Sequence, residues 1–247
     1  MTALRIDHLN RAFGSLVVTD DVSLDIAAGE RHVIIGPNGA GKTSLVNQIG
    51  GQLAPGSGRI FVAGEDITGR SPDRISRMGV ARTFQRNNLF QNLSVIENLR
   101  LAVQGRRGGA LNFFTPVARR HDMIARAEQL MQRVHLGDDG TRLARNLSYG
   151  EQRQLEIGIA LAGEPDLLLL DEPTSGMSPG ETARMIDLIA GLPRTFSILM
   201  IEHDMKVVFS VADRITVLYY GEVLASGPPA EIQANARVRE VYLGMTH

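Results

Sequence analysis

The segment that says most about the architecture reads Gly36-Pro37-Asn38-Gly39-Ala40-Gly41-Lys42-Thr43. It matches G-x-x-x-x-G-K-[ST], the pattern of phosphate-binding loops. The run 31–35 before it, which ends in Val-Ile-Ile, predicts a buried strand, and the residues from Ser44 to Ile49 predict the start of a helix. Strand, glycine-rich turn and helix, in this order, form the structural context that the motif requires.

The residue types of this loop suit an anion. Three glycines allow the backbone to curl so that successive N–H groups point inward. The N-terminus of the following helix adds about half a positive charge at the same place. Lys42 would bring a full charge to the outer phosphates, and the hydroxyl of Thr43 is a ligand that Mg²⁺ accepts. The alternative, a chance glycine-rich turn with a solvated lysine, does not account for the flanking strand and helix.

The composition is that of an ordinary globular protein, with 247 residues, 43% hydrophobic and 21% charged. A net charge of −1 gives no electrostatic basis for binding nucleic acid or an anionic membrane. The absence of cysteine excludes disulfides and thiolate metal sites. No apolar run approaches the roughly 20 residues that span a bilayer, and the N-terminus does not resemble a signal peptide. We therefore expect a cytoplasmic protein that other chains would anchor if it works at a membrane.

Before the phosphate loop, alternating apolar and polar residues predict two half-buried strands over 4–10 and 16–26. The residues between them, 11–15, are interpreted as a turn. Phe13 lies in this turn and has two interpretations. Its ring either fills part of the core or stacks on a nucleotide base.

Two carboxylates follow the most apolar run of the chain. The four leucines 167–170 predict a strand buried on both faces of a parallel sheet, and Asp171 and Glu172 come directly after it. Carboxylates beside such a core are costly unless they are used, and open α/β sheets bind ligands at the carboxyl ends of their strands. We predict that Asp171 holds Mg²⁺, directly or through water, and that Glu172 orients or deprotonates a water. A surface pair without a chemical role is the alternative.

A second buried strand is predicted over 196–201, and His203 and its two neighbours follow its carboxyl end. A lone histidine is usually structural, but this one lies at the same sheet edge as Asp171 if the two strands are parallel neighbours. The spacing S-x-x-E at Ser94 and again at Ser148 predicts the starts of two helices. The basic stretch over 105–120 is interpreted as a solvated loop between helices.

Taken in order, these motifs resemble the ATP-binding subunit of ABC transporters over the whole chain. The residues 147–152, Leu-Ser-Tyr-Gly-Glu-Gln, look like the family signature LSGGQ and precede the carboxylate pair at the family's usual spacing. Gln85 falls at the position of the Q-loop, His203 at that of the switch histidine, and Phe13 at that of the aromatic residue that stacks on adenine.

The resemblance implies an α/β fold, with a P-loop NTPase (RecA-like) core and an antiparallel β subdomain over about 1–85 and 165–247. A helical subdomain inserted over about 86–164 would carry the signature and touch the membrane subunits. Together these parts would form a single ABC ATPase domain over 1–247.

The resemblance also implies a mechanism. Two cassettes of the family pair head to tail, and each ATP, with its Mg²⁺, lies between the phosphate loop of one and the signature helix of the other. A helix N-terminus at Ser148 is a ready anion site, so its capping and binding roles are compatible. Glu172 would be the general base, Gln85 would sense Mg²⁺ and the attacking water, and His203 would contact the γ-phosphate. The implied nucleotide-binding residues are Phe13, Gly36, Pro37, Asn38, Gly39, Ala40, Gly41, Lys42, Thr43, Ser44, Ser148, Tyr149, Gly150 and Glu151, and the implied metal-binding residues are Thr43, Gln85 and Asp171.

Three departures from the family pattern stand out. Tyr149 replaces the first glycine of the signature, Glu151 replaces its final glutamine, and Ser178 replaces the aspartate of the S-A-L-D loop. Motifs around Gln85 (81–85), His203 (201–205) and the C-terminus (241–244) resemble the branched-chain amino acid import group. Related ATPases for urea or amide import or for lipopolysaccharide export share parts of this pattern, and an ABC ATPase without transport is a further alternative.

The resemblance implies partners as well. They are a second ABC ATPase subunit, which is the same chain or a paralogue, and integral membrane permease subunits. A periplasmic or extracellular binding protein would act indirectly, and nucleic acid is not expected. The chain would lie peripherally on the cytoplasmic face of the inner (plasma) membrane.

Overall fold

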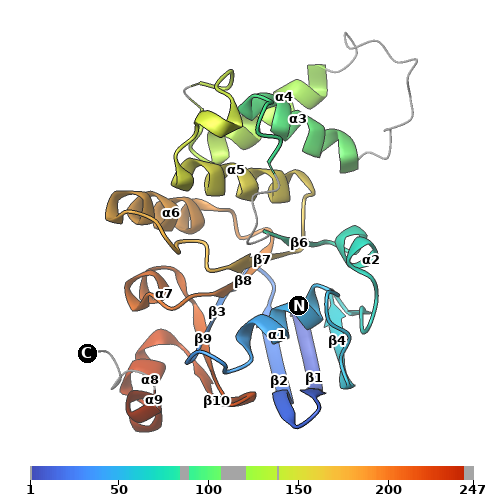
Figure 1. Ribbon diagram of the computed structural model, residues 1–247, viewed down its shortest axis with the longest axis vertical. Coiled ribbons are helices and arrows are strands. Elements are labelled where there is room, and N and C mark those ends of the chain that lie inside the picture. Colours follow the sequence, from blue (N-terminus) through green and yellow to red (C-terminus); the bar gives the residue numbers. More distant parts are fainter. Residues whose placement is uncertain (1, 84–88, 107–120, 138, 242–247) are drawn as a thin grey trace. The chain divides into compact units, whose positions relative to one another are not determined.

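The computed structural model describes residues 2–83, 89–106, 121–137 and 139–241 (Figure 1). The chain divides into two compact units. The sheet unit contains Met1–Arg82, Asp166–Glu172 and Pro193–His247, and the helical unit contains Thr83–Pro165 and Pro173–Leu192. No helix in the described ranges is long and apolar enough to cross a membrane.

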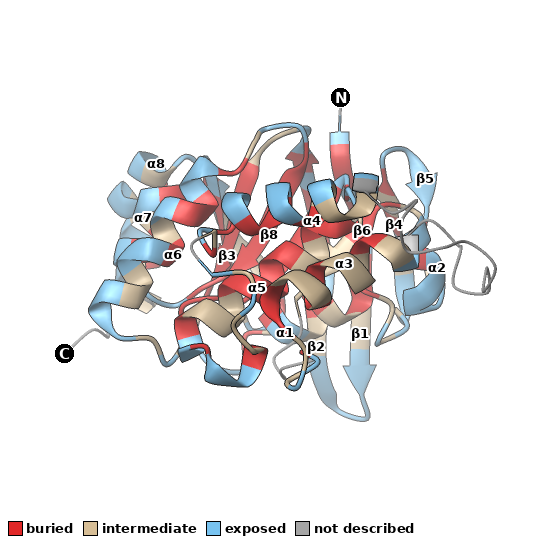
Figure 2. Cartoon of the chain, turned by 90° about the horizontal axis from the view of Figure 1, so that it is seen from above, coloured by how far each residue is buried: buried red, intermediate tan, exposed pale blue. Residues whose placement is uncertain are grey.

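A six-stranded sheet forms the centre of the sheet unit, in the order β10-β9-β3-β8-β7-β6. All its neighbouring strands are parallel except the antiparallel pair β9–β10. Strands β3, β7 and β8 are buried at every residue, as expected for parallel strands covered on both faces; Figure 2 shows β3 and β8 in red. The strands are β3 (Arg31–Ile35), β6 (Val80–Arg82), β7 (Leu167–Asp171), β8 (Ser197–Ile201), β9 (Arg214–Tyr219) and β10 (Glu222–Gly227).

A four-stranded antiparallel sheet, in the order β2-β1-β4-β5, completes the strands of this unit. Its strands are β1 (Thr2–Phe13), β2 (Leu16–Ala27), β4 (Ser57–Val62) and β5 (Glu65–Asp66), and the helices of the unit are α1 (Lys42–Ile49), α2 (Pro72–Arg77), α7 (Met205–Val211), α8 (Pro229–Ala234) and α9 (Ala236–Val241). Leu45 and Ile49 of α1 share one apolar core with side chains of both sheets. Each fully buried aliphatic side chain stabilises the fold by about 1.5–3 kcal/mol, so this core fixes α1, and with it the phosphate loop, on the sheet.

The helical unit packs α4 and α5 against α3, and α6 against α5. Its elements are α3 (Val95–Arg106), α4 (His121–Arg133), η2 (Ala144–Asn146), α5 (Tyr149–Ala162) and α6 (Pro179–Gly191). Ala127 and Leu130 on α4 and Val134 just after it are buried, as expected for apolar residues spaced along one face of a helix. Both predicted capping boxes are present, at Ser94 and at Ser148.

Two expectations from the sequence are corrected. The predicted turn 11–15 is shorter, because β1 continues to Phe13, which pairs with Leu16; only two residues remain, and Gly14 supplies the positive φ of 59° that so tight a turn requires. The helical unit is larger than predicted, because α6 packs on α5. Gln85 and most of the basic stretch lie outside the described residues.

Candidate active site

The parallel sheet brings three predicted site segments to one edge. Strand β3 pairs with β8 at Ile34 and Ile201, and β7 pairs with β8 at Asp171 and the same Ile201. The carboxyl ends of the three strands are therefore level. The phosphate loop follows β3, Glu172 follows β7, and His203 lies two residues beyond β8. The prediction that His203 shares a sheet edge with Asp171 is confirmed.

The phosphate loop depends on glycine for both backbone angle and space. Gly36 has φ 151° and Gly41 has φ 96°, values that other residues rarely adopt. A Cβ at Gly36 would overlap the carbonyl oxygen of Leu218, and one at Gly41 would overlap that of Val18. The backbones of neighbouring strands therefore contact the loop so closely that only glycine fits at these two positions.

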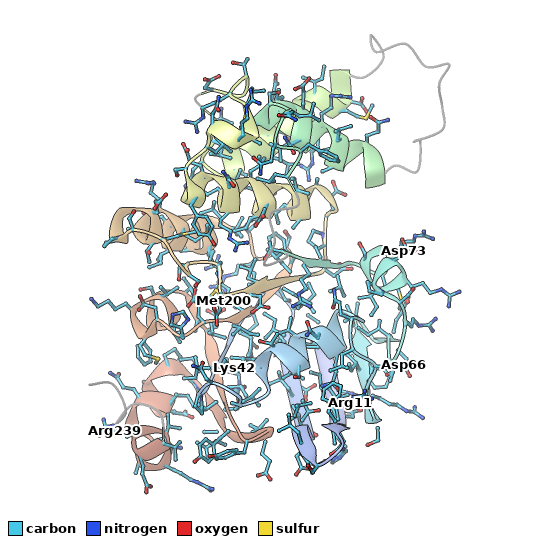
Figure 3. All side chains as sticks on the ribbon, viewed as in Figure 1. Arg11, Lys42, Asp66, Asp73, Met200 and Arg239 are labelled. Carbon is cyan, nitrogen blue, oxygen red and sulfur yellow. The ribbon has the colours of Figure 1, made fainter. Side chains whose placement is uncertain are left out.

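Lys42 starts α1, where Figure 3 labels it. Its ammonium group donates hydrogen bonds to the carbonyl oxygens of Gly36 (2.7 Å) and Pro37 (2.8 Å) inside the curve of the loop. Burial lowers the pKa of Lys42, while the carboxylates of Glu172 and Asp171 oppose this change. A bound phosphate would offer the ammonium group of Lys42 charged oxygens in place of these two carbonyl oxygens. Hydrogen bonds to charged acceptors are stronger than those to neutral ones, so the exchange would be favourable.

Asp171 offers a free acceptor to a metal. Its side chain is 2% exposed, and Oδ2 accepts a hydrogen bond from the guanidinium of Arg82 at 3.1 Å. Its Oδ1 is buried without a hydrogen-bond partner among the described residues, which is costly unless a ligand completes it. The described ranges hold no group of three His, Cys, Asp or Glu side chains suited to a metal. The carboxylate of Asp171 and the hydroxyl of Thr43, an exposed residue, are hard oxygen donors of the kind that Mg²⁺ accepts, and together with phosphate oxygens they could hold this ion.

Glu172 has an unusual backbone. Its φ of 47° lies in the left-handed region, which non-glycine residues adopt at a cost and which is frequent at functional sites. Its N–H donates to the carbonyl oxygen of Ile201 at 3.0 Å, which ties this turn to β8. The side chain is 37% exposed, and its Oε1 lies 3.9 Å from Nδ1 of His203. The general base and the switch histidine implied by the resemblance are therefore neighbours.

Glu202 is a site-supporting residue that the sequence interpretation left without a role. It is fully buried, and its Oε2 accepts a hydrogen bond from the backbone N–H of His203 at 2.9 Å. Asp204, on the other side of His203, caps α7 by accepting from the N–H of Lys206 at 2.8 Å. His203 is thereby fixed between two anchored carboxylates. Its position in the sequence, a charged residue directly after a buried strand, could have indicated that Glu202 belongs to the site.

Phe13 is 49% exposed, so the interpretation as a core-filling ring is wrong. The guanidinium of Arg11 lies 4.8 Å from the centre of its ring. Strand β2, which pairs with β1 beside Phe13, passes the phosphate loop, since a Cβ at Gly41 would overlap the carbonyl oxygen of Val18 on this strand. An exposed ring on this hairpin suits stacking on a base, and that role stays a prediction.

The signature residues lie in the helical unit, at the start of α5. Ser148 caps the helix: its N–H donates to Oε2 of Glu151 at 2.7 Å, and its Oγ accepts from the N–H of Glu151 at 3.3 Å. The other carboxylate oxygen of Glu151 pairs with Arg142. Burial raises the pKa of Glu151, but the bonds to Arg142 and Ser148 outweigh it and leave that pKa below its usual value. The carboxylate that replaces glutamine therefore stabilises the helix start.

The N-terminus of α5 already holds an anion from its own chain. Oε1 of Glu181 accepts hydrogen bonds from Oγ of Ser148 (2.9 Å) and from the N–H of Gly150 (3.1 Å). Its Oε2 accepts from Ser178, which caps α6. These hydrogen bonds, those from Ser178 first, lower the pKa of Glu181 to about 2. The sequence interpretation missed this pair, although Ser178 and Glu181 have the same S-x-x-E spacing that it used at Ser148.

Ser178 also explains one departure from the family pattern. Serine and aspartate are both strong helix N-caps, so the serine that replaces the aspartate still begins α6 with a complete capping box. The third departure, Tyr149, is 40% exposed, and its hydroxyl accepts from the guanidinium of Arg153 (2.9 Å). Tyr149 is thus an exposed, oriented ring at the signature.

Comparison with known proteins matches residues 19–175 to the family described as ABC transporter, and residues 222–244 to the branched-chain amino acid ATP-binding cassette transporter family. The high-affinity branched-chain amino acid transport ATP-binding protein LivG of Salmonella typhimurium is 41% identical over 98% of this chain and 97% of its own. The corresponding protein BraF of Pseudomonas aeruginosa is 39% identical over 98% of this chain and 97% of its own.

Solved structures agree with the sequence relatives. The ADP conformation of an ATP-binding cassette of an ABC transporter superposes with a TM-score of 0.85, at 30% identity, over 99% of both chains. A nucleotide-free ATP-binding cassette gives a TM-score of 0.82 at 28% identity, over 98% of this chain and 99% of its own. The predicted P-loop NTPase fold is confirmed, and the chain belongs to the ABC transporter family.

Proposed function

We propose that the chain is the ATP-hydrolysing subunit of an ABC importer for branched-chain amino acids. The observation that carries the proposal is the edge of the six-stranded sheet, where the phosphate loop, Asp171, Glu172 and His203 come together. The cargo is proposed from the relatives, which are named as branched-chain amino acid transport proteins and match almost the whole chain.

Each group at this edge has a role in the proposed reaction. The N–H groups of the phosphate loop and Lys42 bind the triphosphate, and Phe13 stacks on the adenine. Thr43 and Asp171 hold Mg²⁺, which when bound neutralises charge on the phosphates. Glu172 accepts the proton of the attacking water, and His203 contacts the γ-phosphate.

The second half of the site would come from another cassette, the same chain or a paralogue, paired head to tail. Ser148 and Gly150 offer a hydroxyl and an N–H at a helix N-terminus, which suit the γ-phosphate of the partner's nucleotide. In this structure both donors bind the carboxylate of Glu181. Nucleotide binding between cassettes would therefore exchange an internal anion for the phosphate.

Transport would follow from closing and reopening of this pair. ATP closes the two cassettes, hydrolysis reopens them, and integral membrane permease subunits convert the motion into import. A periplasmic or extracellular binding protein would deliver the amino acid to the permease. The chain would lie at the cytoplasmic face of the inner membrane.

The test replaces Glu172 with glutamine on the chromosome and follows uptake of labelled leucine. The variant is expected to bind ATP, to hydrolyse it roughly 10²–10⁴ times more slowly, and to abolish leucine uptake. Glu222→Gln, on the exposed edge of β10, is the matched control and should behave as wild type. Normal leucine uptake in the Glu172 variant would refute the cargo. A defect in urea or amide use, or in the cell envelope, would then assign the alternative cargo.

A further inference from the structure

We infer that Arg82 is a positioning residue of the magnesium site. It links the strand that carries Asp171 to the helix that carries Thr43, and so fixes the separation of the two metal ligands. The inference rests on the proposed function, because it assumes that these two residues bind Mg²⁺ with the nucleotide. The sequence interpretation quoted Arg82 only as part of a family motif and gave it no role.

The guanidinium of Arg82 is a partly buried fork with three partners. Its side chain is 11% exposed. One nitrogen, NH2, donates to Oδ2 of Asp171 at 3.1 Å. The other, NH1, donates to Oδ1 of Asn47 at 2.8 Å and to Oε1 of Gln52 at 2.9 Å. All four residues belong to the sheet unit, so the network connects elements of one compact body.

Strand register places the fork beside Asp171. Strands β6 and β7 are parallel, and Arg82 pairs with Leu169. Asp171 lies two residues further along β7 and therefore on the same face of the sheet as Leu169. A long side chain at Arg82 reaches the carboxylate diagonally along this face, as the measured hydrogen bond shows.

The second arm of the fork reaches the helix after the phosphate loop. Asn47 lies four residues after Thr43 on α1, so the two share one face of the helix. A hydrogen bond at Asn47 therefore holds the turn of helix that presents the Thr43 hydroxyl. Since the same guanidinium also donates to Asp171, one rigid planar group joins this carboxylate to the helix that begins beside Thr43. Lysine has no such fork and could not make both contacts with the same geometry.

The fork also leaves the metal-binding oxygen free. It occupies Oδ2 of Asp171 alone, while Oδ1 stays buried and without a hydrogen-bond partner in the described part of the chain. A carboxylate anchored through one oxygen presents the other in a fixed direction. Partners that orient metal ligands in this way typically change metal affinity by about 10–100-fold when they are replaced.

The alternative is a structural ion pair that stabilises the sheet unit and has no effect on the metal. The two roles differ in what they predict for Mg²⁺. A structural pair would change thermal stability but not the dependence of ATP affinity on Mg²⁺. A positioning residue would change that dependence and leave metal-free ATP binding intact, because Lys42 and the phosphate loop are not altered.

The experiment measures ATP binding by titration calorimetry in the Glu172→Gln background, where ATP is not consumed. ATP affinity is determined in EDTA and across a series of Mg²⁺ concentrations, and Mn²⁺ binding to the ATP complex is followed by electron paramagnetic resonance. The variants are Arg82→Lys and Asn47→Ala, which remove the fork from opposite ends. Arg77→Lys is the matched control, because Arg77 forms an exposed ion pair with Asp73 on α2.

We expect Arg82→Lys to raise the Mg²⁺ concentration for half-maximal ATP affinity by about 10–100-fold, to broaden the Mn²⁺ signal, and to leave the affinity in EDTA unchanged. Asn47→Ala should shift the Mg²⁺ dependence in the same direction and by less. An unchanged Mg²⁺ dependence in Arg82→Lys would overturn the inference, as would an equal loss of affinity in EDTA. If ATP affinity without the Arg82 change did not depend on Mg²⁺ at all, the proposed metal ligands would fail instead.

Discussion

Replacement of Phe13 by alanine tests whether this ring binds the base of the nucleotide. The ring is 49% exposed at the end of β1, beside the hairpin turn. Its neighbour Leu16 starts β2, and Val18, two residues or about 7 Å further along, has its carbonyl oxygen against Gly41 of the phosphate loop. A base bound outside the loop would lie within reach of the ring.

The size of the effect follows from this exposure. A half-exposed ring at a strand end contributes at most about 1.5 kcal/mol to folding, half the upper value for a fully buried phenylalanine, so the variant should stay folded. Loss of stacking on a base costs about 1–2 kcal/mol, which corresponds to a roughly 5- to 30-fold rise in the dissociation constant of ATP.

Titration calorimetry with ATP and with inorganic tripolyphosphate separates the base from the phosphates. Phe13→Ala should weaken ATP binding and leave tripolyphosphate binding unchanged, because Lys42 and the loop are intact. Leu16→Ala is the matched control, since Leu16 is 64% exposed and pairs with Phe13 across the hairpin. Unchanged ATP affinity in Phe13→Ala, or an equal loss for tripolyphosphate, would refute the stacking role.

Three further changes give distinct outcomes. Lys42→Ala should abolish productive binding of both ATP and tripolyphosphate, because it removes the charge that the loop carbonyls hold; calorimetry that shows unchanged affinity would contradict this role. Asn98→Ala should lower the free energy of unfolding by about 1–3 kcal/mol in denaturant titration, because Asn98 is 1% exposed and accepts from the N–H of Phe90, which would lose its partner; a smaller loss would mean that water replaces the amide. Glu181 should make stability depend on pH, because its pKa is lowered from 4.5 to about 2. Its contribution to the free energy of unfolding is present above about pH 4.5 and is lost as the pH falls toward 2. Glu181→Gln should remove this part of the pH dependence in acid titrations followed by circular dichroism.

Local sequence predicted the elements and the chemistry of the sheet edge. The glycines of the phosphate loop determine its backbone path, because only glycine readily adopts the required backbone angles. The leucines of β7 encode a strand buried on both faces, and the parallel arrangement then places Asp171 level with the end of β8. Capping boxes at Ser94 and Ser148 encode helix starts through contacts three residues apart. Patterns of this kind depend only on neighbours in the chain, so they can be read directly.

Only the tertiary structure decided contacts between residues distant in sequence. Nothing near Arg82 indicates that its guanidinium joins Asn47 to Asp171, because those partners lie 35 and 89 residues away. The same holds for Glu181, whose carboxylate reaches the start of α5 across 31 and 33 residues. Side-chain pairs of this kind depend on how helices and strands pack, and no periodicity or spacing in the chain records that packing.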